Sequence, residues 1–255
     1  MLGLNKDSIA GTIVSATLVC LVCSIFVAAS AVVLKPQQVA NKKLDKQINV
    51  LNVSGLYHSG VDVEEAFSKF EQKAVDLDTG EYLEGVDTST FDIKKASRDP
   101  AMSSEIENDI AGIKRRPNYQ VVYLYKEDNE LQRIILPIHG YGLWSTLYGF
   151  LALEGDANTV YGISFYEHAE TPGLGGEVDN PKWRSVWKGK LAYNDEGEPA
   201  LGLVKGQVDA STPNAEHKVD GLAGATLTAN GVTNMVTYWL GDQGYGPYLK
   251  RMQGE

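Results

Sequence analysis

The chain has 255 residues, a formal net charge of −10 and two cysteines. This length suits one domain or two small ones. An acidic surface repels a phosphate backbone, which argues against nucleic acid as a partner, and two cysteines are too few for a disulfide framework.

The first predicted element is a transmembrane helix over residues 11–34, after a short N-terminal segment, residues 1–10. No charged residue lies between Asp7 and Lys35, and about 20 apolar residues cross the hydrocarbon core of a bilayer. The hydrophobic region of a signal peptide is shorter, about 7–15 residues, and ends in small residues. Ala28–Ala31 resembles such a cleavage site, but the length of the run favours a retained anchor.

Charge alone leaves the orientation of this span open. Lys6 precedes it, and four lysines follow it closely: Lys35, Lys42, Lys43 and Lys46. Taken literally, the positive-inside rule places the large domain in the cytoplasm, but the excess of lysines on that side of the span is small.

Both cysteines, Cys20 and Cys23, lie inside the predicted span. Residues three apart share one face of a helix, so the pair is either a metal or redox site or two small residues at a helix–helix contact. A zinc site needs about four ligands, and the sequence offers no others nearby. We therefore favour the contact and predict no metal site.

Residues 35–117 are predicted to form a membrane-proximal part of the soluble domain. Helices are expected over residues 36–55, ending at Ser54-Gly55, and over residues 61–73. The polar stretch from residue 76 to 117 predicts loops with one further helix near residues 102–114.

Residues 118–255 are predicted to form the ligand-binding part of the domain. β-branched and aromatic residues predict two hairpins, residues 119–125 with 131–138 and 147–153 with 160–166, and a short strand over residues 200–204. A helix opens at Asn180-Pro181 and ends at Gly189, and a last helix runs from about Thr228 to Leu240. Because the strands run together, we expect an α+β fold with a mostly antiparallel sheet and flanking helices.

Three glycine-rich stretches, residues 139–149, 167–178 and 220–231, stand where ligand loops are expected. Glycine lets a backbone approach a ligand closely, and long loops of this kind are often functional. Turn chemistry explains any one of them, but three together favour a shared ligand site. The sequence has no phosphate-binding P-loop, no dinucleotide fingerprint and no nucleophile elbow, so no catalytic residue is predicted.

The third stretch precedes a helix, whose N-terminal N–H groups and dipole favour phosphate. Thr226 or Thr228 can cap that helix, which is the simpler interpretation. The alternative is that a phosphate binds there and one threonine hydroxyl is esterified by it. The residues alone leave both interpretations open.

Residues 220–228, DGLAGATLT, closely resemble the flavinylation motif D-x-x-(S/T)-G-A-T-x-T, in which FMN is joined through its phosphate to a threonine. Together with the N-terminal span, HGYGLWS, ETPGLGGEV-NP-W and WLGDQGYGP, the whole chain resembles the NqrC family, the C subunits of sodium-translocating NADH:quinone oxidoreductases. The G subunit of the Rnf complex is the near neighbour. One departure is Ala223 in place of the motif's Ser or Thr: it lacks the hydroxyl that could donate a hydrogen bond to the phosphate or the backbone, worth roughly 1 kcal/mol, but it leaves the acceptor threonine in place.

By this resemblance Thr226 is the covalent acceptor of FMN, and Thr228 is the fallback acceptor or a residue that holds the phosphate. Asp220 matches the aspartate that the family's flavin transferase requires. The remaining cofactor-binding residues that the resemblance implies come from the three loops: Gly224, Ala225 and Leu227; Glu170, Thr171, Pro172, Gly173, Leu174 and Gly175 along the isoalloxazine; and Leu143, Trp144 and Ser145 on its opposite wall. For Trp183 and Trp187, four residues apart on one helix, core packing is the expected role.

The resemblance also implies the function. The chain would be a single-pass inner-membrane component of a six-subunit sodium pump. Its N-terminus would be cytoplasmic, and its flavin domain, residues 118–255, would be periplasmic. Covalent FMN would relay single electrons between NADH and ubiquinone, away from the sites at which either reacts. A periplasmic flavin transferase and membrane lipid are the other implied partners. Two alternatives stay open: an Rnf-type electron-transport component, and a membrane-anchored binding or sensor domain without a redox role.

Overall fold

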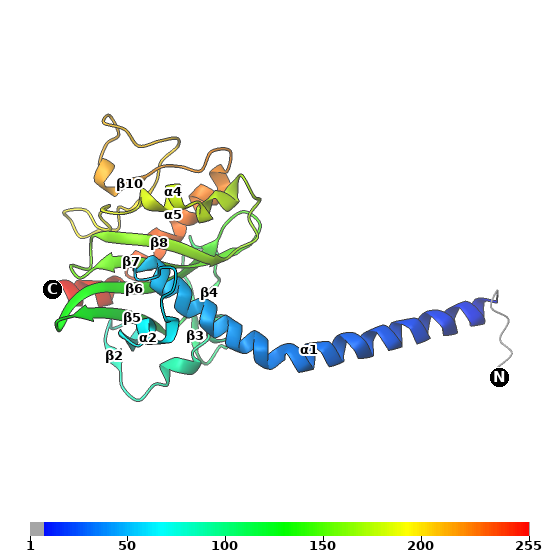
Figure 1. Ribbon diagram of the computed structural model, residues 1–255. Helices are drawn as coiled ribbons and strands as arrows, with labels where there is room; N and C mark the ends of the chain where they lie inside the picture. The colour runs from blue at the N-terminus through cyan, green and yellow to red at the C-terminus, as the bar shows by residue number, and fades with distance from the viewer. Residues whose placement is uncertain (1–7, 255) are drawn as a thin grey trace. The chain divides into compact units, whose positions relative to one another are not determined.

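The computed structural model describes residues 8–254 (Figure 1), so most of the predicted segment 1–10 lies outside the described residues. The chain divides into two compact units, Met1–Asp45 and Lys46–Glu255, and each is considered by itself. The second unit has an antiparallel sheet with helices, so the expected α+β class is confirmed.

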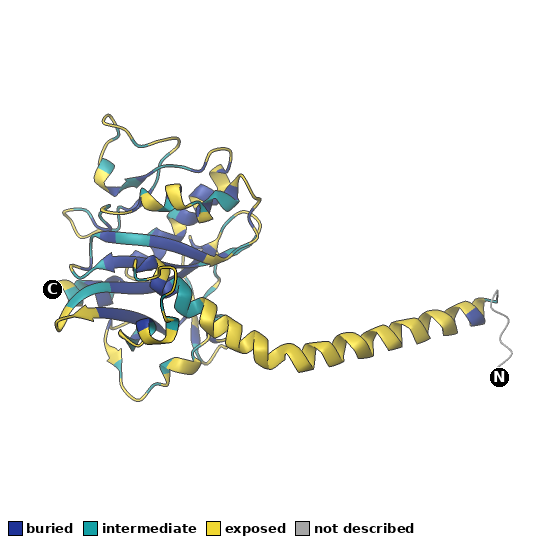
Figure 2. Ribbon diagram, in the orientation of Figure 1, coloured by how far each residue is buried: buried dark blue, intermediate teal, exposed yellow. Residues whose placement is uncertain are grey.

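A single helix, α1 (Ile9–Val53), contains both the predicted span and the helix predicted over residues 36–55, and it passes through Pro36 without a break. Figure 2 shows its first part exposed, and its most apolar 18-residue window is 0% buried with a mean hydropathy of 2.7. Among residues 8–254 it is the one helix long and apolar enough to cross a membrane. Cys20 and Cys23 are exposed free thiols on it. The predicted end at Ser54-Gly55 is confirmed, because Gly55 has a φ of +74°.

The second unit is built on a six-stranded antiparallel sheet in the order β2-β1-β5-β6-β7-β8. Its strands are β1 (Phe70–Asp76), β2 (Tyr82–Leu83), β5 (Tyr119–Glu127), β6 (Glu130–Tyr141), β7 (Thr146–Glu154) and β8 (Val160–Glu167). Both predicted hairpins are confirmed. Asp128 and Asn129, with φ of 50° and 68°, form the two-residue turn between β5 and β6.

The remaining elements are short or lie at the C-terminal end. Two further strand pairs are β3 (Ser103–Glu105) with β4 (Arg115–Pro117), antiparallel, and β9 (Gly202–Leu203) with β10 (Lys218–Val219), parallel. The helices are α2 (Val63–Phe67), α3 (Ile93–Ala96), α4 (Pro181–Ser185), α5 (Thr226–Leu240) and α6 (Gly246–Gln253), with 3-10 turns η1 (Thr88–Thr90), η2 (Gly175–Asp179) and η3 (Ala215–His217).

Alternate residues of the strands supply two separate cores. Val122 and Leu124 belong to the core formed with α5 and α6, whereas Val121 and Tyr123 belong to the one formed with α2 and the end of α1. This period of two is the reason that a strand buried on both faces is apolar throughout. The sheet therefore gives α5 a rigid base, with Trp239 fully buried against it.

One predicted helix is too long and another is wrong. The helix expected over residues 61–73 stops at Phe67, and Phe70–Asp76 is β1, which pairs along its whole length with β5. Residues 102–114 contain β3 and turns, with positive φ at Asn108 and Gly112. In both places partners distant in sequence outweigh a weak local helical pattern. Helix α6 lies where the sequence analysis predicts no element.

The two helices that flank the glycine loops are close to prediction. Asn180 caps α4 by accepting the N–H of Lys182 at 3.0 Å, as the Asn-Pro signal predicts, but the regular helix ends at Ser185, short of Gly189. Helix α5 begins at Thr226, two residues before the predicted start, and is followed by Gly241 as predicted.

Candidate functional site

The N-terminus of α5 carries no side-chain cap. Its N-cap is Ala225, which has no side-chain oxygen, and Thr226 and Thr228 both lie inside the helix. The interpretation of either threonine as the N-cap is therefore wrong. The first N–H groups of α5 remain available to an external acceptor such as a phosphate.

The two threonines lie on opposite sides of α5. Successive residues of a helix turn by about 100°, so residues two apart are separated by about 200°. Thr226 is exposed and borders a cavity together with Ala229 and Asn230. Thr228 is fully buried, and the same face of the helix carries Gly231, which packs on the strand β6.

The cavity beside Thr226 has a volume of about 660 Å³. Apolar side chains form much of it, including Trp183, Val186 and Leu203, and Lys182 and Lys205 contribute the positive charge. Among the predicted site residues only Asp220, Gly224 and Thr226 line it. The sequence prediction missed Asn230, although it lies one helical turn after Thr226 on α5. It also missed the segment 203–207, because nothing local in the sequence indicates that β9 pairs with β10 and so brings this segment to the motif.

Asp220 holds the motif to that neighbouring segment. Its carboxylate Oδ1 accepts the N–H of Val208 at 2.8 Å, and its carbonyl accepts the Nε1–H of Trp183 at 2.8 Å. Trp183 contacts Trp187 edge to face, with 5.5 Å between the ring centroids. Core packing is confirmed for Trp187, which is fully buried, whereas Trp183 both packs on it and lines the cavity.

On the opposite side of α5, Glu170 joins three segments of the chain. Its Oε1 accepts the backbone N–H groups of Leu143 at 3.1 Å and Trp144 at 3.0 Å, and its Oε2 accepts the hydroxyl of Thr228 at 2.6 Å. The side chain is almost fully buried. Gly175 is required there, because a Cβ at this position would lie 2.5 Å from the Thr228 hydroxyl oxygen.

Two opposing effects act on the pKa of Glu170. Burial raises it, and the hydrogen bonds from Thr228, Trp144 and Leu143 lower it; the hydrogen bonds prevail, so the pKa lies below its ordinary value. Next to it, the Nδ1 of His168 accepts the N–H of Glu170 at 3.2 Å, which leaves the proton on Nε2, 2.8 Å from a carboxylate oxygen of Asp179. Hydrogen bonds between its own residues thus stabilise the loop that contains Glu170.

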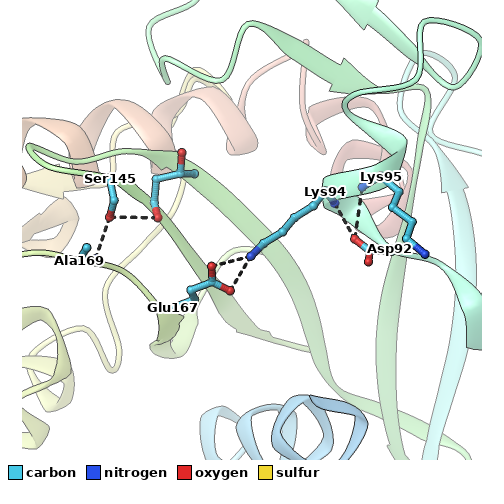
Figure 3. Close-up of polar contacts among 7 residues, drawn as sticks. Asp92, Lys94, Lys95, Ser145, Glu167 and Ala169 are labelled. Carbon is cyan, nitrogen blue, oxygen red and sulfur yellow. Dashed lines mark hydrogen bonds and ion pairs between the residues drawn. The ribbon is translucent and has the colours of Figure 1, made fainter. Parts of the chain in front are cut away.

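Polar contacts also fix the neighbouring end of β8 (Figure 3). The hydroxyl oxygen of Ser145 accepts the N–H of Ala169 at 2.7 Å. The Nζ of Lys94 lies 2.5 Å from both carboxylate oxygens of Glu167 and 4.4 Å from the centre of the Tyr148 ring. Lys94 thus connects helix α3 to the last residue of β8 and to β7.

The other predicted site residues divide between the two sides of α5. Large apolar side chains are exposed at Leu143, Trp144, Leu174 and Leu227, and Leu174 also lies over Gly224 at the cavity. Thr171, Pro172 and Gly173 are exposed, and Ala225 is buried. The structure therefore brings residues 143–145 and Glu170 together on the side of α5 away from the cavity, whereas Leu174, later in the same loop, reaches the cavity at Gly224.

Comparison with known proteins gives consistent results. Residues 142–241 match the family model of the FMN-binding domain. The chain is 49% identical to the C subunit of the Na(+)-translocating NADH-quinone reductase of Pseudomonas aeruginosa over 98% of both chains, and 48% identical to that of Vibrio alginolyticus over 98% of this chain and 97% of the other.

Two solved structures are similar to this chain and carry the same family name. The crystal structure of Shewanella oneidensis NqrC superposes with a TM-score of 0.79 at 36% identity, covering 85% of this chain and all of that one. The crystal structure of the corresponding C subunit of the Na(+)-translocating NADH-quinone reductase from Parabacteroides distasonis gives 0.67 at 28% identity, covering 85% of this chain and 96% of that one.

Proposed function

The chain belongs to the NqrC family, the C subunits of Na+-translocating NADH-quinone reductases, and on this basis we propose that it relays electrons through FMN esterified by its phosphate to Thr226. FMN is the cofactor of its matching domain. Its partners are the other subunits of an NADH-quinone reductase complex.

The observation that carries the linkage is the position of Thr226. Its side chain is exposed at the first turn of a helix whose N-cap, Ala225, offers no side-chain acceptor or donor. A phosphate on this hydroxyl would lie within reach of the free N–H groups of that turn and gain from the helix dipole. The residues present therefore fit the phosphate end of FMN.

The neighbouring cavity fits the rest of the cofactor. Small-molecule and cofactor sites measure about 300–1,000 Å³ and are mostly apolar with a few polar groups, and the cavity beside Thr226 measures about 660 Å³. Trp183, Val186 and Leu203 would hold the flavin ring, and Lys182 and Lys205 would balance the phosphate charge. Leu174, at the edge of the cavity, is the residue of the predicted ring-lining loop that supports this arrangement best.

The expected contacts of Leu143, Trp144 and Ser145 with the isoalloxazine stay a prediction, since these residues lie with Glu170 on the other side of α5. The proposed electron-relay role depends on FMN being bound at the site beside Thr226. FMN, when bound, supplies one-electron redox chemistry, and the protein sets its environment and holds it in place. NADH oxidation and quinone reduction would then take place on other subunits.

The topology is proposed from the family. Residues 11–34 would span the inner membrane once, with residues 1–10 in the cytoplasm, residues 35–117 as the membrane-proximal segment, and residues 118–255 as the flavin-carrying part in the periplasm. A periplasmic flavin transferase would attach the cofactor, lipid would surround α1, and six subunits would complete the complex.

The experiment that tests the linkage is in-gel flavin fluorescence under denaturing conditions. The full-length protein is compared with Thr226→Ala and Thr228→Ala, in cells that export the domain and carry an active transferase. We expect fluorescence in the parent and in Thr228→Ala, and none in Thr226→Ala. A parent without fluorescence, alongside a second substrate that is labelled, would contradict the proposal and favour an anchored binding domain; the co-purifying subunits distinguish this complex from Rnf.

A further inference from the structure

We propose that Glu170 selects the flavin acceptor: it holds the hydroxyl of Thr228 as a buried donor, so that Thr226 is the only threonine of the pair that can react. This inference rests on the covalent linkage proposed above and assigns a role to a positioning residue that does not itself become modified. It answers a question that the motif raises, because the two threonines are chemically identical and two residues apart.

The two threonine hydroxyls differ in accessibility. Thr228 is 0% exposed, and its hydroxyl lies 2.6 Å from the Oε2 of Glu170, which is itself only 4% exposed. Gly175 closes the space in front of that hydroxyl so tightly that even a methyl group would not fit. Thr226, by contrast, faces the cavity. A transferase that must bring a flavin phosphate to a hydroxyl can reach only Thr226.

The contact between Glu170 and Thr228 has a possible second role, in catalysis. A carboxylate beside a hydroxyl is also the arrangement of a nucleophile with its general base. Here the carboxylate already accepts the N–H groups of Leu143 and Trp144, and the hydroxyl has no open side for an electrophile. Hydrogen bonds to an ionised carboxylate are among the stronger ones in proteins, so the contact holds Thr228 rather than activating it.

The transfer of the flavin phosphate to threonine involves no change of oxidation state. The donor is a flavin whose phosphate belongs to a phosphoanhydride. The hydroxyl oxygen of the threonine forms a bond to the flavin-side phosphorus, the anhydride P–O bond breaks, the second nucleotide leaves with the bridging oxygen, and the hydroxyl proton passes to a base of the transferase. A hydroxyl whose proton is held by Glu170 in a closed space cannot take part in this step.

The test uses the full-length chain, coexpressed with the transferase, and maps the modified residue by mass spectrometry of flavin-containing peptides. The variants are Thr226→Ala alone and combined with Glu170→Ala, Glu170→Ser or Glu177→Ala. Glu177 belongs to the same loop, but its carboxylate contacts Asn180 instead of Thr228, which makes it the matched control.

We expect no flavin peptide in Thr226→Ala or in the Glu177→Ala combination, and a flavin on Thr228 in the Glu170→Ala combination. The gain should be at least about tenfold, the factor that corresponds to about 1.4 kcal/mol and thus to one charge-assisted hydrogen bond. If the Glu170→Ala combination lacks a cooperative unfolding transition, the Glu170→Ser combination, whose small side chain also opens the space beside Thr228, is judged by the same criterion.

Three results would overturn the inference. They are flavin on Thr228 at the parent level in Thr226→Ala alone, a folded Glu170 combination without flavin, and an equal gain in the Glu177→Ala control. A parent chain without covalent flavin is a different result, because it contradicts the proposed linkage itself.

Discussion

Replacing Glu170 by Gln should destabilise the second unit of the chain in a manner that depends on pH. The amide keeps one oxygen that can accept the N–H groups of Leu143 and Trp144, but its NH₂ replaces the oxygen that accepts from Thr228. Three charge-assisted hydrogen bonds become neutral ones, a difference of roughly 1 kcal/mol each. Removing a buried charge recovers part of this, so we expect a net loss of about 2 kcal/mol at pH 7.

The pH dependence follows from the direction of the pKa shift. The folded-state pKa of Glu170 lies below its value in the unfolded chain, which is near 4.5. Its contribution to stability is therefore complete above the unfolded-state pKa and is lost as the pH falls through the folded-state pKa. The difference between parent and variant should stay constant from pH 8 to about 5.5 and shrink below about 4.5.

The assay is thermal unfolding of the full-length chain in detergent, followed by the fluorescence of its four tryptophans. For a domain of 150–250 residues, about 2 kcal/mol corresponds to a fall in Tm of about 4–8 °C. Glu177→Gln is the control and should change Tm little. Thr228→Val should not add to Glu170→Gln, since both remove the same contact. Equal Tm values for parent and Glu170→Gln at pH 7, or a difference that persists unchanged at pH 4, would refute the reasoning.

Three further predictions concern other parts of the second unit. Gly231→Ala should cost more than 2 kcal/mol by urea denaturation, roughly the cost of overpacking, because its Cβ would lie 2.4 Å from the carbonyl oxygen of Tyr141. Lys94→Ala should cost less than about 1 kcal/mol, and less still in high salt, because its ion pair with Glu167 is partly exposed. Burial lowers the pKa of His139 to about 3, so between pH 6.5 and 5 only the unfolded chain binds a proton at this residue. The parent should therefore lose roughly 2 kcal/mol of folding stability over that range. His139→Phe should abolish this loss, measured as Tm against pH.

The parts of the fold that sequence reasoning predicted are those fixed by neighbours along the chain. The hairpin of β5 and β6 depends on runs of β-branched and aromatic residues and on the turn at Asp128 and Asn129, two residue types that tolerate positive φ. The start of α4 depends on Asn180 and Pro181 alone. Such signals act over a few residues, so one sequence is enough to recognise them.

The parts that were missed depend on partners far away in the chain. β1 is a strand because it pairs with β5, with Phe70 opposite Tyr125, and its own residues would equally well continue a helix. The cavity beside Thr226 needs the segment 203–207, which the pairing of β9 with β10 brings to the motif. The contact between Glu170 and Thr228 joins residues 58 positions apart, and no local pattern contains that information.

The spacing of two residues between the motif threonines acquires its meaning from the helix on which they stand. In a strand, residues two apart point to the same side, and both hydroxyls would face the same solvent or ligand. On α5 the same spacing separates them by about 200°, so Thr226 borders the cavity and Thr228 enters the core beside Glu170. Both threonines lie on helical backbone because α5 begins at Thr226 and not at Thr228. The start of α5 at Thr226 thus leaves the first N–H groups of the helix without a side-chain cap, available to the proposed phosphate, and it also determines which threonine hydroxyl is exposed beside them.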